Sequence, residues 1–358
     1  QVQVDPTERI MDLIASDLRI DQVCLNTLVE HEQFEDPQVG DQTWLQQLGM
    51  ENIASYFPRL GNGVTIALID TGVDLTVSEM GEIVINPGIP EGLSFATGPN
   101  DSGNASDVVG HGTKVASVSA ATGNDGLNGI GGAPRANVVP IRVFANTDSG
   151  VKGNSLWVAE AIASAYLMGV DVINLSLGDR SRVNVGCQKV SSRDYYERVF
   201  GNLQAIAEEA GLSKMPIVVA ATGNDGRRVR CPACVESVIA VGSVRLNDEG
   251  VWERSPFSNY GDEIDFVAEG DHILTTLQGG EFGDTGPGTS FSAPQVTGLI
   301  ALMLAENPNL TTPEVVEKIK TCFSEDLLEP GWDEETGWGR IVIPAPSGSS
   351  AGCSTSSD

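Results

Sequence analysis

The chain has 358 residues, of which 41% are hydrophobic and 20% are charged, as is ordinary for a globular protein. Its 49 acidic residues against 21 basic ones give a net charge of −28. This balance argues against nucleic acid and anionic membrane as partners, and it favours solubility in salt and bound divalent cations. No apolar run reaches the roughly 18 residues of a membrane helix, so we expect no membrane span.

The two ends of the chain differ in composition from the part between them. Residues 1–35 carry Ile10, Ile14 and Leu18 at helical spacing, which predicts a short amphipathic helix. This N-terminal extension can be a pro-segment remnant, an extension that packs on the main domain, or a loosely held arm. The main domain is expected over residues 36–344. Residues 345–358, rich in Ser, Gly and Pro, predict a flexible tail.

Between these ends, short apolar β-branched runs alternate with segments of helical periodicity. The runs cover residues 64–69, 138–143, 170–175, 216–220 and 238–241, and the helical segments cover 156–168 and 195–210. Continuous apolar strands separated by helices indicate a mainly parallel sheet covered on both faces, which is an α/β fold in three layers. Such a sheet has its functional loops at the carboxyl ends of the strands.

Polar residues that suit catalysis follow these strands. Asp70 comes directly after the first run and Asn224 after another, while His111 lies between two glycines at the start of a helix of small residues. The chain has three histidines, of which His31 lies in the polar extension and His272 in an acidic turn. Because histidine has a pKa near neutrality, His111 is the natural candidate for a general base.

A second candidate segment runs from Gly288 to Pro294 and contains Ser290. The apolar run 296–305 that follows predicts a buried helix, so Ser290 is expected just ahead of a helix N-terminus. The positive end of a helix dipole favours an anion, which suits a nucleophilic serine. Taken alone, the segment is equally compatible with a helix that merely has a polar cap.

Taken together, these segments resemble the subtilisin-like serine proteases, the subtilases. The resemblance extends over about residues 36–341 and rests on motifs around Asp70, His111, Asn224 and Ser290, with Asn174–Gly178 and Ser237–Gly242 in addition. The catalytic residues of this family occur in the order Asp, His, Ser, which is the order here. An esterase of the α/β-hydrolase kind would need Gly-x-Ser-x-Gly and the order Ser, Asp, His, and that order does not occur here.

The resemblance implies a three-layer α/β/α subtilisin-like fold and a serine endopeptidase. Ser290 would be the nucleophile that forms an acyl-enzyme, His111 its general base, and Asp70 the residue that orients His111. Asn224 would donate its side-chain N–H to the oxyanion. The alternative is a latent or catalytically silent relative that acts as a zymogen or a binding module, with the extension over the cleft.

The resemblance also implies polypeptide substrates, bound as an added strand between two segments of the enzyme. The primary pocket would be lined by residues 220–224 and the loop after Cys231, and Asp179 and Asp225 at its rim could favour basic or polar substrate residues. The expected substrate-binding residues are Gly150, Val151, Ser176, Leu177, Gly178, Ala221, Thr222 and Gly223. We expect a monomer, with a propeptide or protein inhibitor as a possible partner.

Structural calcium is the cofactor that the resemblance implies. Its predicted ligands are Asp36, Glu79 and Asn124, the last of these in the loop 122–128. Calcium takes six to eight oxygen ligands from flexible loops, which this segment could provide. A simple polar turn after a helix is the other interpretation of the same loop.

The six cysteines permit up to three disulfides, which favours a secreted or extracellular protein. Cys231 and Cys234 form the one close pair, without the second pair or nearby histidines that a zinc site needs. From expected proximity within the resembled fold, we predict a bridge from Cys187 to Cys231 or Cys234 and another from Cys322 to Cys353. The bond between Cys231 and Pro232 is predicted to be cis.

Overall fold

The computed structural model describes residues 34–78, 92–96, 103–148, 150–179, 182–185, 188–209, 214–328 and 330–346. The fold and site below concern these residues alone. The predicted helix around residues 10–18, the predicted ligand Glu79 and most of the predicted tail lie outside them. The predicted division of the chain at residues 35 and 345 therefore stays a prediction.

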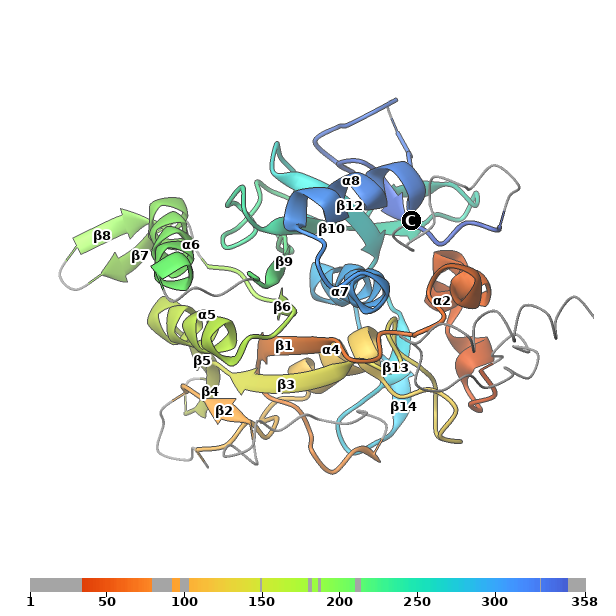
Figure 1. The fold of residues 1–358 in the computed structure, drawn as a ribbon, viewed down its shortest axis with the longest axis horizontal. Coiled ribbons are helices and arrows are strands. Elements are labelled where there is room, and N and C mark those ends of the chain that lie inside the picture. The colour runs from red at the N-terminus through yellow and green to blue at the C-terminus, as the bar shows by residue number, and fades with distance from the viewer. Residues whose placement is uncertain are drawn as a thin grey trace, which may run out of the picture. The chain divides into compact units, whose positions relative to one another are not determined.

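A ten-stranded sheet forms the middle of the domain (Figure 1), with the strand order β15-β16-β12-β10-β9-β6-β1-β3-β2 and β11 paired to β10. The strands from β12 to β2 all pair in parallel, and β11 and β15 pair antiparallel. The sheet strands are β1 (Thr65–Asp70), β2 (Leu93–Ser94), β3 (Asn137–Arg142), β6 (Val172–Leu175), β9 (Ile217–Ala221), β10 (Ile239–Leu246), β11 (Trp252–Arg254), β12 (Ile264–Glu269), β15 (Ser324–Glu325) and β16 (Arg340–Ile341).

Three two-stranded hairpins lie outside this sheet: β4 (Phe144–Thr147) with β5 (Gly150–Gly153), β7 (Arg182–Val185) with β8 (Gln188–Ser191), and β13 (Leu274–Thr276) with β14 (Phe282–Asp284). The helices are α2 (Thr43–Leu48), α3 (Ile53–Tyr56), α4 (His111–Ala120), α5 (Ser155–Met168), α6 (Ser192–Glu209), α7 (Thr289–Glu306) and α8 (Thr312–Cys322), with short 3-10 turns at Val39–Asp41 and Met50–Asn52.

Helices cover the sheet on both faces, as the apolar strands predict. One core cluster joins alternate strand residues such as Ile66 and Val219 to α2, α3, α4, α7 and α8. The other joins the intervening residues, such as Ala67 and Val218, to α5 and α6 (Figure 1). Because successive strand side chains point to opposite faces, a strand buried on both sides must be apolar at every position. The three-layer α/β/α fold is confirmed.

The order in which the chain adds strands to the sheet reverses between β1 and β6, although the two strands are parallel. From β1 the chain continues through α4 to β3 on one side, and from β6 it continues through α6 to β9 on the other. In open parallel sheets, ligands bind beyond the carboxyl ends of the strands where the order reverses, because the loops there diverge and leave a crevice. Asp70 is the last residue of β1, and Ser176 follows the last residue of β6.

Most predicted boundaries agree with the structure to within one or two residues, but two differences affect the site. Asp70 belongs to β1 and does not follow it, so its backbone is held in the sheet by pairing with Arg142. The helix after Gly288 begins at Thr289 and not near residue 296, so Ser290 lies in its first turn. The sheet strand β12 was not predicted. Its sequence Ile-Asp-Phe-Val-Ala-Glu lies in the long polar stretch between β10 and α7.

The predicted bridge from Cys187 is wrong, because Cys231 and Cys234 are bonded to each other. Their Cα atoms lie 4.6 Å apart within one turn, which is a normal separation for a disulfide. Cys322 is also disulfide-bonded, and its predicted pairing with Cys353 lies outside the described residues. The Cys231–Pro232 bond is cis, as predicted.

Candidate active site

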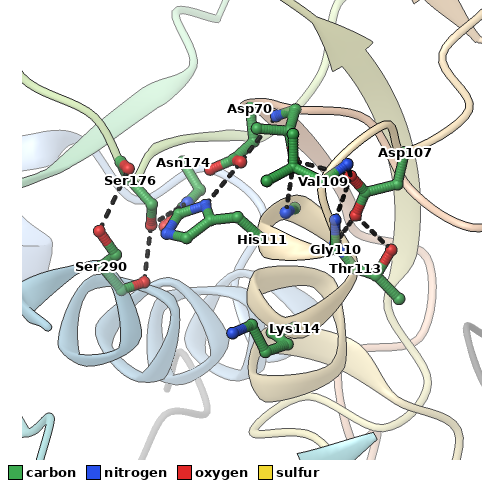
Figure 2. Close-up of polar contacts among 12 residues, drawn as sticks. Asp70, Asp107, Val109, Gly110, His111, Thr113, Lys114, Asn174, Ser176 and Ser290 are labelled. Carbon is green, nitrogen blue, oxygen red and sulfur yellow. Dashed lines mark hydrogen bonds and ion pairs between the residues drawn. The ribbon is translucent and has the colours of Figure 1, made fainter. Parts of the chain in front are cut away.

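Asp70 and His111 meet at the carboxyl end of β1 (Figure 2). The Asp70 carboxylate accepts a hydrogen bond from the backbone N–H of Thr71 at 2.6 Å, and its Oδ1 lies 2.7 Å from Nδ1 of His111. Asp70 is almost fully buried, whereas the His111 side chain is 30% exposed. The contact leaves Nε2, the other ring nitrogen of His111, free to face the space in front of α7.

Asp107 fixes the start of the helix that carries His111, and the sequence analysis missed it. Its Oδ1 accepts hydrogen bonds from the backbone N–H groups of Val109 and Gly110 and from the hydroxyl of Thr71. Its Oδ2 accepts from the backbone N–H and the hydroxyl of Thr113. One carboxylate therefore satisfies unpaired N–H groups at the start of α4 and ties that helix to the residue after Asp70. An acidic residue just ahead of a predicted helix was the signal available in the sequence.

Two glycines let α4 approach β1 closely. A Cβ atom on Gly112 would lie 2.0 Å from the carbonyl oxygen of Gly72, and one on Gly72 would lie 2.4 Å from that of Ala105. Gly72 also has a φ of +107°, which other residues rarely adopt. A larger residue at position 112 would push α4 away from the end of β1 and disturb the contact between Asp70 and His111, and one at position 72 would displace the segment at residues 105–106.

The surroundings of His111 raise its pKa above the ordinary value of 6.5. Burial by itself opposes this, because it disfavours the charged imidazolium. The negative charge of Asp70 and its hydrogen bond act in the other direction and outweigh burial, with a smaller contribution from Asp107. Lys114, which donates to the carbonyl of Thr285, lowers the pKa slightly. The imidazole is therefore a stronger base than a free histidine.

We expect Asp107→Asn to lower both stability and activity. An amide in place of the carboxylate would turn an N–H group toward N–H donors of α4, which costs about 1–3 kcal/mol for an unpaired buried group. A displacement of His111 would lower kcat/KM by about 10- to 100-fold. Urea unfolding and peptide hydrolysis measure the two effects. Asp41→Asn removes an equal charge from an exposed position and should change neither. Normal activity in Asp107→Asn would contradict the assignment.

Pro294 determines how Ser290 is held. Within α7, the N–H of residue 294 would normally bond to the carbonyl of Ser290, but proline has no N–H. The freed carbonyl instead accepts a hydrogen bond from the hydroxyl of Ser176 at 2.9 Å. Asn174 donates to the Ser176 hydroxyl and accepts from Thr297 on α7, which closes the connection between β6 and α7.

The hydroxyl of Ser290 lies on the side of α7 that faces Ser176 and His111 (Figure 2). In this structure it donates to the carbonyl of Ser176 at 3.3 Å. Among the described residues it makes no hydrogen bond to His111. The ring of Phe291 lies 5.5 Å from the His111 ring, centre to centre, and packs against it. A rotation about χ1 of Ser290 is the change that would redirect its hydroxyl.

Asn224 presents an unpaired amide N–H to this site. Its Oδ1 accepts from both the backbone N–H and the hydroxyl of Thr289, at 2.9 and 2.8 Å. With the oxygen held in this way, Nδ2 has no hydrogen-bond partner in the part of the chain that the structure describes. Thr289 is the residue before Ser290, so the amide is fixed directly to the first turn of α7. The role of Asn224 was predicted, but that of Thr289 in holding its amide was not.

A cavity of about 160 Å³ opens beside Ser290 and Asn224. Of the predicted substrate-binding residues, Leu177, Gly178, Ala221 and Gly223 line it. Its remaining lining residues are Asp225, Arg230 and Thr289. The predicted loop after Cys231 does not line it. The residue that does is Arg230, directly before Cys231.

The other predicted substrate-binding residues lie elsewhere around the cavity. Thr222 is fully buried, with its carbonyl bonded to Asn259 and Arg230, so it supports the wall and does not line it. Gly150 and Val151 belong to β5, an exposed strand of the hairpin that follows β3. Ser176 contacts Ser290 directly through the two hydrogen bonds above.

Two of the predicted calcium ligands, Asp36 and Asn124, accept hydrogen bonds from N–H groups in this structure and do not face a shared ion. The Asp36 carboxylate accepts hydrogen bonds from the backbone N–H groups of Asn124, Asp125 and Gly126, at 2.6, 3.0 and 2.9 Å. The side-chain oxygen of Asn124 accepts from the N–H of Glu35. N–H groups that converge on a carboxylate are the wrong partners for a cation, which needs oxygens. In the described ranges, no cluster of three or more His, Cys, Asp or Glu side chains could hold a metal.

We therefore expect Asp36 itself to hold the loop 122–128. Asp36→Asn should lower the free energy of unfolding by about 1–3 kcal/mol, because three backbone N–H groups of the loop lose a charged acceptor. Thermal unfolding of both proteins with calcium and with a chelator tests this. Any calcium-dependent shift in Tm should be the same in the variant as in the parent. A shift that Asp36→Asn abolishes would show that Asp36 is a calcium ligand after all.

Comparisons with known proteins agree with this geometry. The profile of the subtilase family matches residues 61–339. Subtilisin NAT from Bacillus subtilis subsp. natto is 31% identical over 266 residues, covering 73% of this chain and 60% of the relative. The major intracellular serine protease of Bacillus subtilis (strain 168) is 34% identical over 254 residues, covering 68% of this chain and 69% of that protein.

A solved structure of a protease from Pseudoalteromonas arctica PAMC 21717 aligns with a TM-score of 0.66 at 25% identity, over 86% of this chain and 97% of that one. The chain spans about three-fifths of the length of Subtilisin NAT and Subtilisin E. Two matching relatives are named as intracellular, so the expected extracellular location stays a prediction. Within the described residues, no helix is both long and apolar enough to cross a membrane.

The family match covers most of the chain. It includes β1, α4, the loop after β9 and the first turn of α7, which carry Asp70, His111, Asn224 and Ser290. The chain therefore belongs to the subtilase family.

Proposed function

We propose that this chain is a serine endopeptidase that cleaves polypeptides through an acyl-enzyme on Ser290. The observation that supports this most is the buried Asp70 carboxylate 2.7 Å from Nδ1 of a partly exposed His111, beside a serine in the first turn of a helix. A base that is oriented by a carboxylate and lies near a hydroxyl is the arrangement that activates a serine nucleophile.

In the first half of the reaction, the Ser290 oxygen attacks the carbonyl carbon of the scissile bond. Nε2 of His111 takes the hydroxyl proton, and Asp70 stabilises the resulting imidazolium by its charge and hydrogen bond. The proton then passes from Nε2 to the departing amine, the C–N bond breaks, and an ester to Ser290 remains. In the second half, water gives a proton to His111 and attacks the ester, and the carboxylic acid leaves as the proton returns to Ser290.

Asn224 stabilises the negative charge that develops on the carbonyl oxygen. Its Nδ2 is free to donate because Thr289 holds the amide oxygen, and the backbone N–H of Ser290, at the positive end of α7, is the second donor. Loss of the corresponding donor in a subtilisin lowers kcat by about 10²–10³, and we adopt that figure for Asn224→Ala.

The pH dependence of hydrolysis follows from the raised pKa of His111. Only the neutral imidazole accepts a proton, so kcat/KM should be low in acid and increase as pH rises through the pKa of His111 in the free enzyme. Because Asp70 raises this pKa, the midpoint should lie above 6.5. A pH series with a neutral peptide substrate measures it. A midpoint at or below 6.5 would show that burial outweighs Asp70.

Two measurements test the function as a whole. The intact chain is assayed against a panel of chromogenic peptides and is treated in parallel with a serine-directed sulfonyl fluoride, followed by mass spectrometry. We expect hydrolysis of at least one peptide, and loss of activity that tracks a single modification on the tryptic peptide containing Ser290. Labelling without hydrolysis would favour the latent form. Hydrolysis that persists after complete labelling would contradict the proposal.

Export from the cell is proposed on separate grounds. The Cys231–Cys234 disulfide and the bonded Cys322 suit an oxidising compartment. The large excess of acidic residues suits a soluble protein in salt.

A further inference from the structure

The wall of the cavity beside Ser290 carries an arginine. A Cβ atom on Gly178 would lie 3.2 Å from Cβ of Arg230, and one on Gly223 would lie 3.1 Å from its Cδ. The side chain of Arg230 therefore crosses between two opposite walls of the pocket and limits its depth. Gly223 has a φ of +107°, so a side chain that would displace Arg230 is disfavoured there.

Of the three guanidinium nitrogens of Arg230, only Nε has an ion-pair partner among the described residues. Its Nε lies 2.6 Å from Oδ2 of Asp225, and the Arg230 side chain is 38% exposed. Its terminal N–H groups have no hydrogen-bond or ion-pair partner among the described residues. A guanidinium has five N–H donors in a planar fork and binds carboxylates well. The ion pair with Asp225 is at Nε, so the terminal N–H groups remain available to a second carboxylate.

The acidic residues at the rim are less available to a basic substrate than the sequence indicates. Asp225 is paired with Arg230. Asp179 accepts a hydrogen bond from the hydroxyl of Tyr196 at 2.7 Å, and burial raises its pKa. Neither carboxylate is a free acceptor for a lysine or arginine side chain.

Beyond Arg230 lies a larger cavity of about 670 Å³ that shares Asp225 and Arg230 with the first. Three further arginines, Arg193, Arg227 and Arg228, line it. Arg193 pairs with Glu263, and Arg228 with Glu334 at 2.8 Å. Arg227 forms no ion pair among the described residues, and neither does Asp262, which also lines this cavity.

We propose that this pocket selects substrates with an acidic side chain immediately before the scissile bond, and that Arg230 is the residue that determines this specificity. The inference rests on the proposed peptidase function. The carboxylate of a substrate glutamate or aspartate would bind the terminal N–H groups of Arg230, which the ion pair between Nε and Asp225 leaves without a partner among the described residues.

The test compares two peptides that differ only in glutamate or glutamine before the cleaved bond. Because glutamine has the same shape without the charge, the ratio of kcat/KM values isolates the charge. We expect a Glu/Gln ratio of about five to ten, since a charged hydrogen bond is favourable but the site is partly exposed to solvent. Raising the ionic strength from about 0.05 M to about 1 M should reduce the ratio.

Arg230→Gln should bring the ratio to about one or below, and Asp225→Asn should not reduce it, because the competing carboxylate is gone. The matched control is Arg245→Gln. Arg245 pairs with Glu253 and is 39% exposed, but it lies outside the pocket, so its loss should leave the ratio unchanged.

A ratio at or below one in the parent, or a high ratio that survives Arg230→Gln, would overturn the inference. A preference for small neutral side chains would mean that the pair with Asp225 cancels the charge of Arg230. If Arg230→Gln does not fold, the ratio in the parent and its salt dependence decide alone. Failure of the peptidase proposal looks different, because neither peptide would then be cleaved.

Discussion

Replacing Ser290 by alanine is expected to lower kcat for peptide hydrolysis by about 10⁶, the largest effect of any single substitution here. The hydroxyl is the atom that forms the acyl-enzyme, and no neighbouring group can take its place. Alanine suits the first turn of α7, and the Ser290 carbonyl that Ser176 binds is retained. The fold should therefore survive the change. Steady-state hydrolysis of the best peptide measures the effect.

The control for Ser290→Ala lies in the same segment. Ser292 is fully buried on α7, and its hydroxyl has no hydrogen-bond partner in the described part of the chain. Ser292→Ala removes the same atom two residues away without leaving a neighbour unpaired, so activity should stay within a few-fold. Near-normal hydrolysis by Ser290→Ala, or its loss in Ser292→Ala alone, would refute the assignment of the nucleophile.

Asp70→Asn is expected to lower kcat by about 10⁴, as it does in other enzymes with this triad. The amide can keep the bond from the N–H of Thr71, but it offers His111 a donor or a neutral acceptor in place of a carboxylate. Neutral His111 then no longer prefers the tautomer that carries its proton on Nδ1. That tautomer is the one whose Nε2 has a free lone pair to act as the base. The imidazolium formed during acylation also loses its partner.

The same variant makes a second prediction through the pKa of His111. Without the charge of Asp70, burial is the main remaining influence, so the pKa of His111 should fall. The acid limb of the residual pH profile should therefore move to lower pH while the maximum decreases. Asp74→Asn is the matched control, since Asp74 bonds to Thr76 and Gly279 away from His111. A profile in Asp70→Asn with an unshifted midpoint would mean that Asp70 does not set the pKa of His111.

Both effects depend on a site that is held by buried hydrogen bonds from several elements. Asp107 ties α4 to β1, and the Asn174–Ser176 pair ties β6 to α7. Each bond is between groups far apart in the sequence. We therefore expect the geometry of the site to be lost together with the packing of α4 and α7, and not before it.

Several features of this protein follow from the sequence alone. Apolar β-branched runs that alternate with helical periodicity require burial on both faces, so the parallel three-layer fold is decided by local pattern. The order of Asp70, His111 and Ser290 and the short motifs around them identify the family, because these residues lie at strand and helix ends that the pattern also locates. Asn224 was found in the same way, from its position after β9.

Other features were decided only by tertiary structure. The pairing of Cys231 with Cys234, the carboxylate of Asp107 under α4, and the bonds from Asp36 to the loop 122–128 depend on which segments the fold brings together. The same holds for Arg230, which is an unremarkable charged residue in the sequence. It becomes part of the pocket because β6 and β9 are neighbours, and the loops after them face each other across its side chain. The local conformational preferences of the chain determine where helices and strands form. Contacts between side chains that are distant in the sequence depend on how those helices and strands pack.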